Sequence, residues 1–116
     1  MTTLFVVNDP PYGTERAYNA LRLAGALVKR EESRVRVFLM GDAAACAKAG
    51  QSVPNGYYSL ERMIAGVTRR GGEVAACGTC MDARGIADAE LAEGTRRGTL
   101  DELADWTLEA DRVLVF

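Results

Sequence analysis

Two cysteines three positions apart are the residues of this sequence best suited to chemistry. Cys77 and Cys80 lie in the stretch VAACGTCMDARG, at the end of an apolar run and just before an Arg-Gly pair. This spacing is compatible with a redox couple, half of a metal site, a sulfur-handling nucleophile with a neighbouring thiol, or two small core residues. The rest of the sequence favours some of these alternatives over others.

The residues that follow the first cysteine predict a reactive thiol. Residues 78–85 are predicted to form a short helix with Cys77 at its amino end, where free amide groups favour a thiolate. Cys80 and Arg84 follow three and seven positions later, so the three side chains share one helix face. The charge of Arg84 is then expected near the thiols. We therefore predict that at least one cysteine has a lowered pKa.

Metal and cofactor chemistry have little support in the sequence. A structural zinc site needs four ligands, but there is no His and only three Cys, so Asp82 or a second subunit would have to contribute. A thioredoxin-like protein shares the C-x-x-C, but here no aromatic residue precedes the first cysteine. A His-based triad, a P-loop and a G-x-G-x-x-G motif are also absent. The sequence predicts neither a metal site nor a cofactor.

The composition predicts one domain, residues 1–116, in the cytoplasm. Apolar residues make up 48% and charged residues 26%, which is ordinary for a globular domain. The net charge of -2 gives no reason to expect direct nucleic-acid binding, and Arg69-Arg70 and Arg96-Arg97 are interpreted as solvated helix ends. No membrane-spanning stretch or signal peptide is evident, and an odd number of cysteines without one favours a reducing compartment.

Apolar patterns predict strands and helices in alternation. Short apolar runs at 4–7, 35–40, 73–76 and 112–116 indicate buried strands, and helical spacing indicates helices at 14–29, at 59–70 and from 99 onward. Thr14 is the expected cap of the first helix, and Thr99 with Glu102 forms a capping box for the last. Three side chains of the last helix are expected to face the core: Leu103, Trp106 and Leu108.

The segments between these elements carry weaker patterns. An alanine-rich helical turn is expected around Cys46, which is interpreted as a small core residue. Residues 86–98 are interpreted as a helical turn and a loop. Residues 53–58 are either a mobile lid or a connector.

The alternation predicts an α/β fold: a three-layer sandwich with a mostly parallel sheet of four to five strands and helices on both faces. Ligands of such sheets collect beyond the carboxyl ends of the strands. The segment NDPPYG follows the first strand and CGTC the third, so both are expected at one edge. NDPPYG is either a simple turn or one border of a thiol pocket, through Asp9 and Tyr12.

Three segments resemble the DsrE/DsrF-like family, and more closely its small YchN-type members: DPPYGTERAYNALRLAGAL, VRVFLMGDAA and ACGTCMDARGI. The resemblance covers essentially the whole chain. It implies a three-layer, flavodoxin-like α/β architecture, homo-oligomers that are typically trimers or hexamers, and sulfur relay chemistry. In the better-understood members a persulfide forms on a cysteine eight residues before the glycine of the Arg-Gly pair. Here that position is Cys77, counted back from Gly85.

Two functional hypotheses follow. In the first, the protein is a cofactor-free sulfur carrier or sulfurtransferase, in which Cys77 holds sulfur, Arg84 stabilises the thiolate and Cys80 assists or resolves the persulfide. A sulfur donor or acceptor protein is then its partner. In the second, it is a non-catalytic oligomeric protein that binds a ligand or senses redox state through the two cysteines. The candidate substrate-binding residues are Asp9, Tyr12, Gly78 and Thr79.

Overall fold

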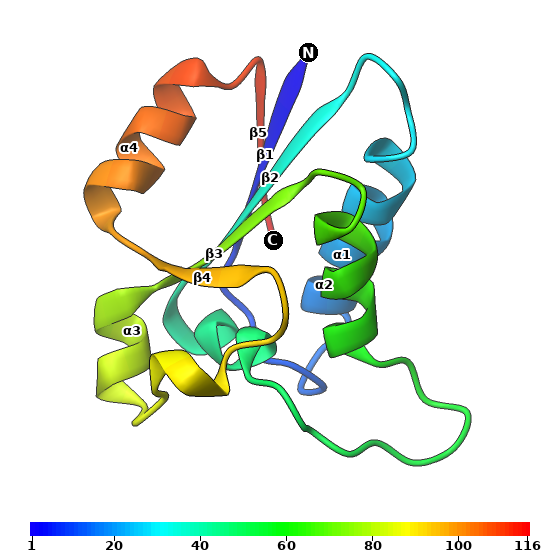
Figure 1. The fold of residues 1–116 in the computed structure, drawn as a ribbon, viewed down its shortest axis with the longest axis vertical. Coiled ribbons are helices and arrows are strands. Elements are labelled where there is room, and N and C mark those ends of the chain that lie inside the picture. The colour runs from blue at the N-terminus through cyan, green and yellow to red at the C-terminus, as the bar shows by residue number, and fades with distance from the viewer.

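Five parallel strands form one sheet in the order β4-β3-β2-β1-β5 (Figure 1). The computed structural model describes residues 1–116. The strands are β1 (Thr2–Val7), β2 (Arg34–Leu39), β3 (Glu73–Cys77), β4 (Thr95–Gly98) and β5 (Arg112–Val115). The predicted α/β class with a parallel sheet is therefore confirmed, and the strand order, which the sequence left open, is now defined.

Helices lie on both sides of this sheet, as expected for a three-layer sandwich. Figure 1 shows α1 (Arg16–Leu27) and α2 (Leu60–Thr68) on one side and α4 (Leu100–Glu109) on the other. The shorter α3 (Gly78–Ala83) and the 3-10 turns η1 (Gly41–Ala47) and η2 (Asp88–Glu90) lie at the carboxyl ends of the strands. None of these helices is both long enough and apolar enough to span a bilayer.

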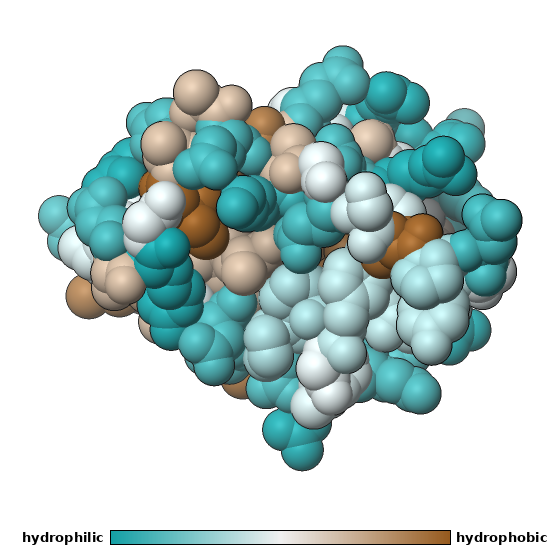
Figure 2. All heavy atoms as spheres, turned by 90° about the horizontal axis from the view of Figure 1, so that it is seen from below, coloured by the Kyte–Doolittle hydropathy of each residue, from teal (hydrophilic) through white to brown (hydrophobic).

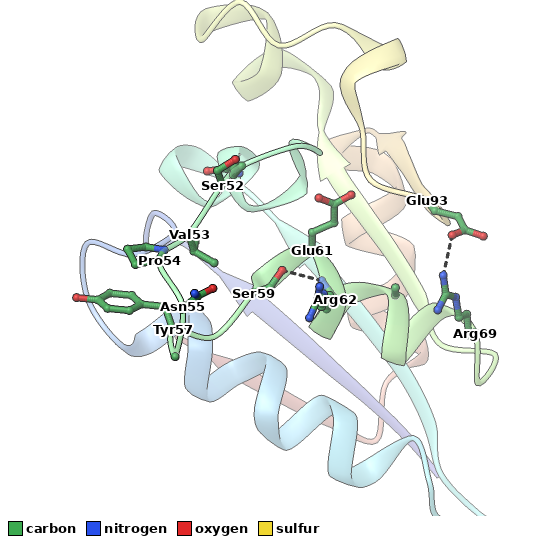
Figure 3. Close-up of a pocket in the computed structure, with 13 residues that line it drawn as sticks. Ser52, Val53, Pro54, Asn55, Tyr57, Ser59, Glu61, Arg62, Arg69 and Glu93 are labelled. Atoms are coloured by element: carbon green, nitrogen blue, oxygen red, sulfur yellow. Dashed lines mark hydrogen bonds and ion pairs between the residues drawn. The ribbon is translucent and has the colours of Figure 1, made fainter.

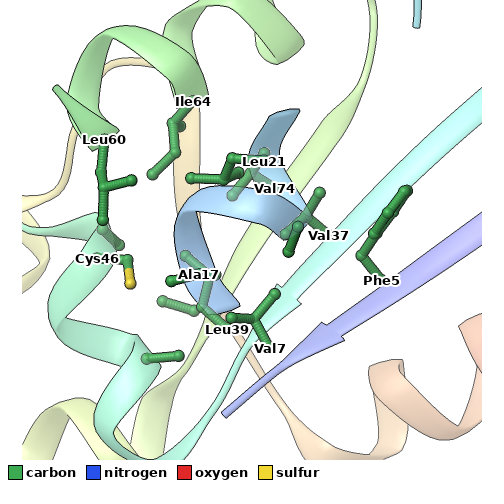
Figure 4. Packing of buried hydrophobic residues seen from close by; sticks show 14 of the residues in the cluster. Phe5, Val7, Ala17, Leu21, Val37, Leu39, Cys46, Leu60, Ile64 and Val74 are labelled. Carbon is green, nitrogen blue, oxygen red and sulfur yellow. The ribbon is translucent and has the colours of Figure 1, made fainter. Parts of the chain in front are cut away.

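The main core fills the space between the sheet and the α1–α2 layer (Figure 4). Alternate strand side chains point into it, including Phe5 and Val37, and the helices contribute Leu21 and Ile64. Cys46, from η1, is also fully buried here, which confirms its interpretation as a core residue. Because burial raises the pKa of the Cys46 thiol to about 12, this cysteine stays protonated at neutral pH.

The second core, on the α4 side of the sheet, is smaller and includes one of the candidate thiols. It consists of six buried residues: Leu4, Phe38, Ala75, Cys77, Leu103 and Trp106. The Trp106 ring meets Phe38 edge to face with the centroids 6.2 Å apart. Two guanidinium groups, of Arg36 and Arg96, lie over the same indole at 5.2 and 5.5 Å. Helix α4 is thus attached to the sheet through Trp106 at its centre.

Ion pairs complete the attachment of α4 to the sheet. Arg36 is buried between Glu73 on β3 and Glu109 on α4, and Arg96 pairs with Glu102.

The prediction that Leu108 faces the core is wrong, because its side chain is 86% exposed. Each residue advances a helix by about 100°, so the turn that faces Leu103 and Trp106 inward directs Leu108 outward.

The two predicted helix caps differ in outcome. Thr99 caps α4, because its hydroxyl accepts the Glu102 amide at 3.1 Å. Thr14 does not cap α1, which begins at Arg16. The Thr14 hydroxyl lies one residue before the cap position, Glu15; it donates to the Asp9 carboxylate at 2.7 Å and accepts the Arg16 amide at 3.3 Å.

Strand β4 is the element that the sequence patterns missed. Residues 95–98 were expected to be turn or loop, but they pair with β3 in parallel register, with Cys77 opposite Gly98. The stretch TRRG has no alternation of apolar and polar residues, so periodicity gave no strand signal. The interpretation of Arg96 and Arg97 as a helix end is consequently wrong, whereas Arg69 and Arg70 do follow the last turn of α2.

Candidate functional site

Cys77 ends β3 and stands directly before α3, so its sulfur is held by the backbone that turns from strand to helix. Its Sγ accepts a hydrogen bond from the Cys80 amide at 3.4 Å and lies 3.3 Å from the Thr79 hydroxyl. Burial raises the pKa of Cys77, but hydrogen bonds from the thiol of Cys80, the Thr79 hydroxyl and both backbone amides outweigh it, so the net shift is downward. The geometry thus favours a thiolate at Cys77.

The Cys77 side chain lies at the margin of the smaller core. Only 9% of the residue is exposed, and it packs in the same cluster as Leu103 and Trp106. Thr79, which contacts the sulfur, is exposed to solvent. A small reagent therefore approaches the sulfur from the α3 side, while α4 restricts access from the other.

Cys80 is the second thiol of the site, and its environment differs from that of Cys77. Its Sγ accepts the Gly41 amide at 3.1 Å. Gly41 has φ of 57°, a left-handed conformation that glycine adopts without strain. Burial, together with the hydrogen bond that its thiol donates to Cys77, raises the pKa of Cys80. Cys77 is therefore the more acidic thiol of the pair and Cys80 the less acidic one.

Arg84 lies beside Cys80 and not beside Cys77. Its guanidinium pairs with Asp42 at 2.7 Å and donates to the Cys80 carbonyl oxygen at 3.1 Å. Its charge partly offsets the raised pKa of Cys80, and it is not among the groups that lower the pKa of Cys77. The structure thus brings Cys77, Cys80 and Arg84 together as predicted. The positive charge of Arg84, however, lies beside the second thiol, Cys80, and acts on its pKa.

Arg97, on β4, is a site residue that the sequence analysis missed. Its side chain lies across Gly78, where an added Cβ would be 2.7 Å from the Arg97 Nε. It pairs with Asp82 on α3 at 2.6 Å and with Asp88 at 3.4 Å. Gly78 therefore provides the room for Arg97 to bind α3 from the neighbouring strand. Because the strand itself had no sequence signal, no pattern could have placed this arginine.

Asp9 and Tyr12 lie away from the thiol pair. The Asp9 carboxylate accepts from Thr14 and pairs with Arg16. The Tyr12 hydroxyl accepts the Leu60 amide at 3.1 Å, and its ring stacks on Tyr58. No hydrogen bond or ion pair joins either residue to Cys77 or Cys80, whereas the Asp9 carbonyl oxygen accepts from the buried Cys46 thiol at 3.8 Å. The NDPPYG segment thus anchors the start of α2, and its predicted role as a border of the thiol pocket gains no support from these contacts.

The cavity beside α2 is a separate feature from the thiol site. About 890 Å³ lies between the loop at 51–57 and α2 (Figure 3), lined largely by polar side chains and by the Arg69–Glu93 ion pair. No cysteine lines it. The loop at 53–58 consequently covers this cavity and not the thiols. Figure 2 views the carboxyl edge of the sheet, which is hydrophilic over most of its area with small apolar patches recessed between polar side chains.

No three His, Cys, Asp or Glu side chains are grouped so that they could hold a metal ion. The site offers two adjacent thiols with unequal pKa values, hydrogen-bonded by backbone amides of α3 and of η1.

A family model describes residues 1–116 of the chain, and its description is "DsrE/DsrF-like family". The chain belongs to this family. The family model therefore covers the sequence from end to end.

Relatives of this DsrE/DsrF-like chain include "Protein YchN" of Escherichia coli (strain K12), which is 44% identical over 114 residues, 97% of each chain. "Uncharacterized protein MK0008" of Methanopyrus kandleri is 43% identical over 115 residues, which cover 96% of this chain and 90% of the relative. The crystal structure of the E. coli YchN protein matches with a TM-score of 0.94 over 100% of this chain and 99% of that one. A protein of unknown function from Methanobacterium thermoautotrophicum, MTH1491, shares the fold at 13% identity with a TM-score of 0.75, covering 99% and 98% of the two chains.

The unequal thiols predict an order of alkylation. With iodoacetamide at mildly acidic pH, we expect Cys77 to react first, because its pKa is lowered, and Cys46 last, because it is buried with a pKa raised to about 12. Peptide mapping of partly modified native protein gives the order. Reaction of Cys46 before Cys77 would show that the ionised thiol is assigned to the wrong residue.

Proposed function

We propose that this protein is a sulfur carrier, or sulfurtransferase, that holds sulfane sulfur as a persulfide on Cys77. The observation that supports this most directly is the hydrogen bonding of Cys77 Sγ by the Cys80 amide and the Thr79 hydroxyl, which stabilises the nucleophilic thiolate. Membership of the DsrE/DsrF-like family is consistent with the proposal.

The proposed reaction is a thiol–persulfide exchange. The Cys77 thiolate attacks the outer sulfur of a donor persulfide, R–S–SH; the donor S–S bond breaks, a Cys77–S–SH bond forms, and the donor leaves as the thiolate R–S⁻. Electrons balance without a cofactor, because the sulfane sulfur passes from one thiol to the other. The Thr79 hydroxyl and the Cys80 amide contact the attacking sulfur and hold it in place.

Cys80 gives the proposed carrier a way to discharge. When its thiolate attacks the Cys77 sulfur of the persulfide, a Cys77–Cys80 disulfide forms and HS⁻ leaves. The Gly41 amide and the charge of Arg84 favour the thiolate form of Cys80 that this step needs. A dithiol reductant would then restore both cysteines. Alternatively, a partner protein accepts the sulfur from Cys77 before Cys80 reacts.

The partners of the carrier are part of the proposal. A sulfur donor and an acceptor protein in the cytoplasm would deliver and remove the sulfur, and the chain would act as a homo-oligomer, a trimer or hexamer. Exposed apolar side chains on the α4 side of the sheet support self-association: Leu100, Leu108, Val113 and Val115. Sedimentation analysis of the reduced protein would measure the oligomer.

The contact between the two thiols favours a second candidate function, a redox sensor without sulfur transfer. Cys80 donates to Cys77 through its amide, and its thiol hydrogen-bonds the Cys77 sulfur, so an oxidant could join them directly. In that case the disulfide itself would be the signal.

One experiment separates the two functions. The reduced protein is treated anaerobically with polysulfide, and sulfur gained per chain is measured by intact mass while released sulfide is assayed. A carrier gains one sulfur or releases one sulfide per chain. Cys77→Ser should abolish both the mass gain and the sulfide release. The matched control, Cys46→Ser, should retain both. A sensor gives neither product with polysulfide yet forms a Cys77–Cys80 disulfide with diamide. This second result would exclude the carrier function.

A further inference from the structure

A groove runs between α1 and α2 on the side of the molecule that faces away from the sheet. It encloses about 460 Å³. Gly25 on α1 and Gly66 on α2 form part of its floor, and a Cβ added at either would meet no atom within 4 Å. The side chains of the two helices thus leave a channel into which another backbone can approach closely.

The rim of this groove carries only positive charge. Arg22, Lys29 and Arg70 line it, and no Asp or Glu does. None of the three forms an ion pair with a carboxylate, unlike Arg36 and Arg96 on the other side of the sheet. In a protein of net charge -2, this is a local concentration of unpaired cations around an uncharged floor.

We infer that the α1–α2 groove binds an acidic amphipathic helix of a partner protein. A helix laid between two others packs its small or apolar ridge into the channel, and glutamates on its flanks meet the cations of the rim. The chain seats its own acidic helix in a related way, because arginines pair with Glu102 and Glu109 of α4 across an apolar contact. The inference does not rest on the thiol chemistry.

Other anionic partners fit the groove less well. A membrane surface binds apolar side chains that protrude, whereas here the apolar floor is recessed between the helices. A nucleic acid requires a track of several phosphate contacts, and three cations around an apolar floor do not form one. An acidic amphipathic helix fits both features, because its apolar side chains can reach the recessed floor and its carboxylates can meet the cations of the rim.

The test uses a synthetic peptide of about 20 residues, long enough to be helical, with an Ala/Leu stripe flanked by Glu. We expect saturable binding by fluorescence anisotropy, weakened by salt, and amide shift changes in the protein confined to α1 and α2. The double reversal of Lys29→Glu with Arg70→Glu should weaken binding at least about tenfold. Reversing two cations outside the groove, Arg34→Glu with Arg112→Glu, should change it less than about twofold.

A second variant tests the shape of the groove without changing its charge. Gly66→Leu fills the floor, and a folded protein is expected because Leu favours a helix more than Gly does. We expect this variant to weaken the peptide at least about tenfold as well. The inference is overturned by absent binding, by equal loss in the Arg34/Arg112 control, by shift changes on another surface, or by tighter binding to anionic vesicles or duplex RNA than to the peptide.

Discussion

Replacing Cys80 by Ser is expected to trap sulfur on Cys77. In the proposed reaction the Cys80 sulfur is the only internal nucleophile beside the persulfide, so its loss should slow sulfide release at least about 100-fold, because an intramolecular attack is replaced by a bimolecular one. We expect Cys77 to react first, because its pKa is lowered while that of Cys80 is raised. Adding a sulfur to Cys77 moves the ionisable position from the Cys77 Sγ to the outer sulfur of the persulfide. The Gly41 amide remains at 3.1 Å to favour ionisation of Cys80.

The measurement follows protein loaded with polysulfide and freed of donor by gel filtration. Intact mass should show the added sulfur persisting in Cys80→Ser and decaying in the unmodified protein, as a Cys77–Cys80 disulfide and one sulfide appear. Cys46→Ser serves as the matched control, since it also removes a thiol but lies in the other core. Equal lifetimes of the adduct in the unmodified protein and in Cys80→Ser would show that Cys80 plays no part in discharge.

Trp106→Ala is expected to produce the largest loss of stability, about 3–5 kcal/mol. The indole is 5% exposed and touches Phe38 and two guanidinium groups, so its removal leaves a cavity in a core of only six residues. Small domains have unfolding free energies of about 5–15 kcal/mol, so this is a large share of the total. Urea unfolding followed by circular dichroism gives the value.

Leu108→Ala, two residues along the same helix, is the matched control. Its side chain is 86% exposed, so we expect a change within about 0.5 kcal/mol in the monomer. Because Cys77 shares the smaller core with Trp106, the Trp106 variant should also raise the alkylation rate of Cys77. A loss below about 1 kcal/mol in Trp106→Ala would contradict the conclusion that α4 is attached through this side chain.

Much of the fold was predictable because the main elements carry strong local signals. The apolar runs of β1, β2 and β3 and the helical spacing of α1 and α2 predicted these elements and their parallel arrangement. The Thr99 cap was predictable for the same reason, since it depends on residues within one turn.

What the sequence did not predict depends on contacts between distant residues. The extended conformation of β4 is determined by pairing with β3, and Arg97 reaches α3 only through that pairing. α1 begins one residue later than its sequence pattern suggested, with Glu15 at the cap position, and the Thr14 hydroxyl joins the Asp9 carboxylate to the Arg16 amide. At the site, the proximity of the two thiols followed from their spacing, but the position of the Arg84 guanidinium beside Cys80 depends on its pairing with Asp42 of η1.

The outermost strands β4 and β5 differ in a way that bears on how copies of the chain can meet. Arg96 and Arg97 occupy the middle of β4, and charged side chains there oppose pairing with a foreign strand. β5 has Arg112 only at its start, followed by exposed Val113 and Val115. β5 is therefore the edge strand better suited to extending the sheet into a second copy. Pairing of one β5 with another β5 relates the two copies by a two-fold axis, so the sheet does not grow beyond this pair. Side-chain surfaces are therefore a better basis than backbone pairing for an assembly with three-fold symmetry.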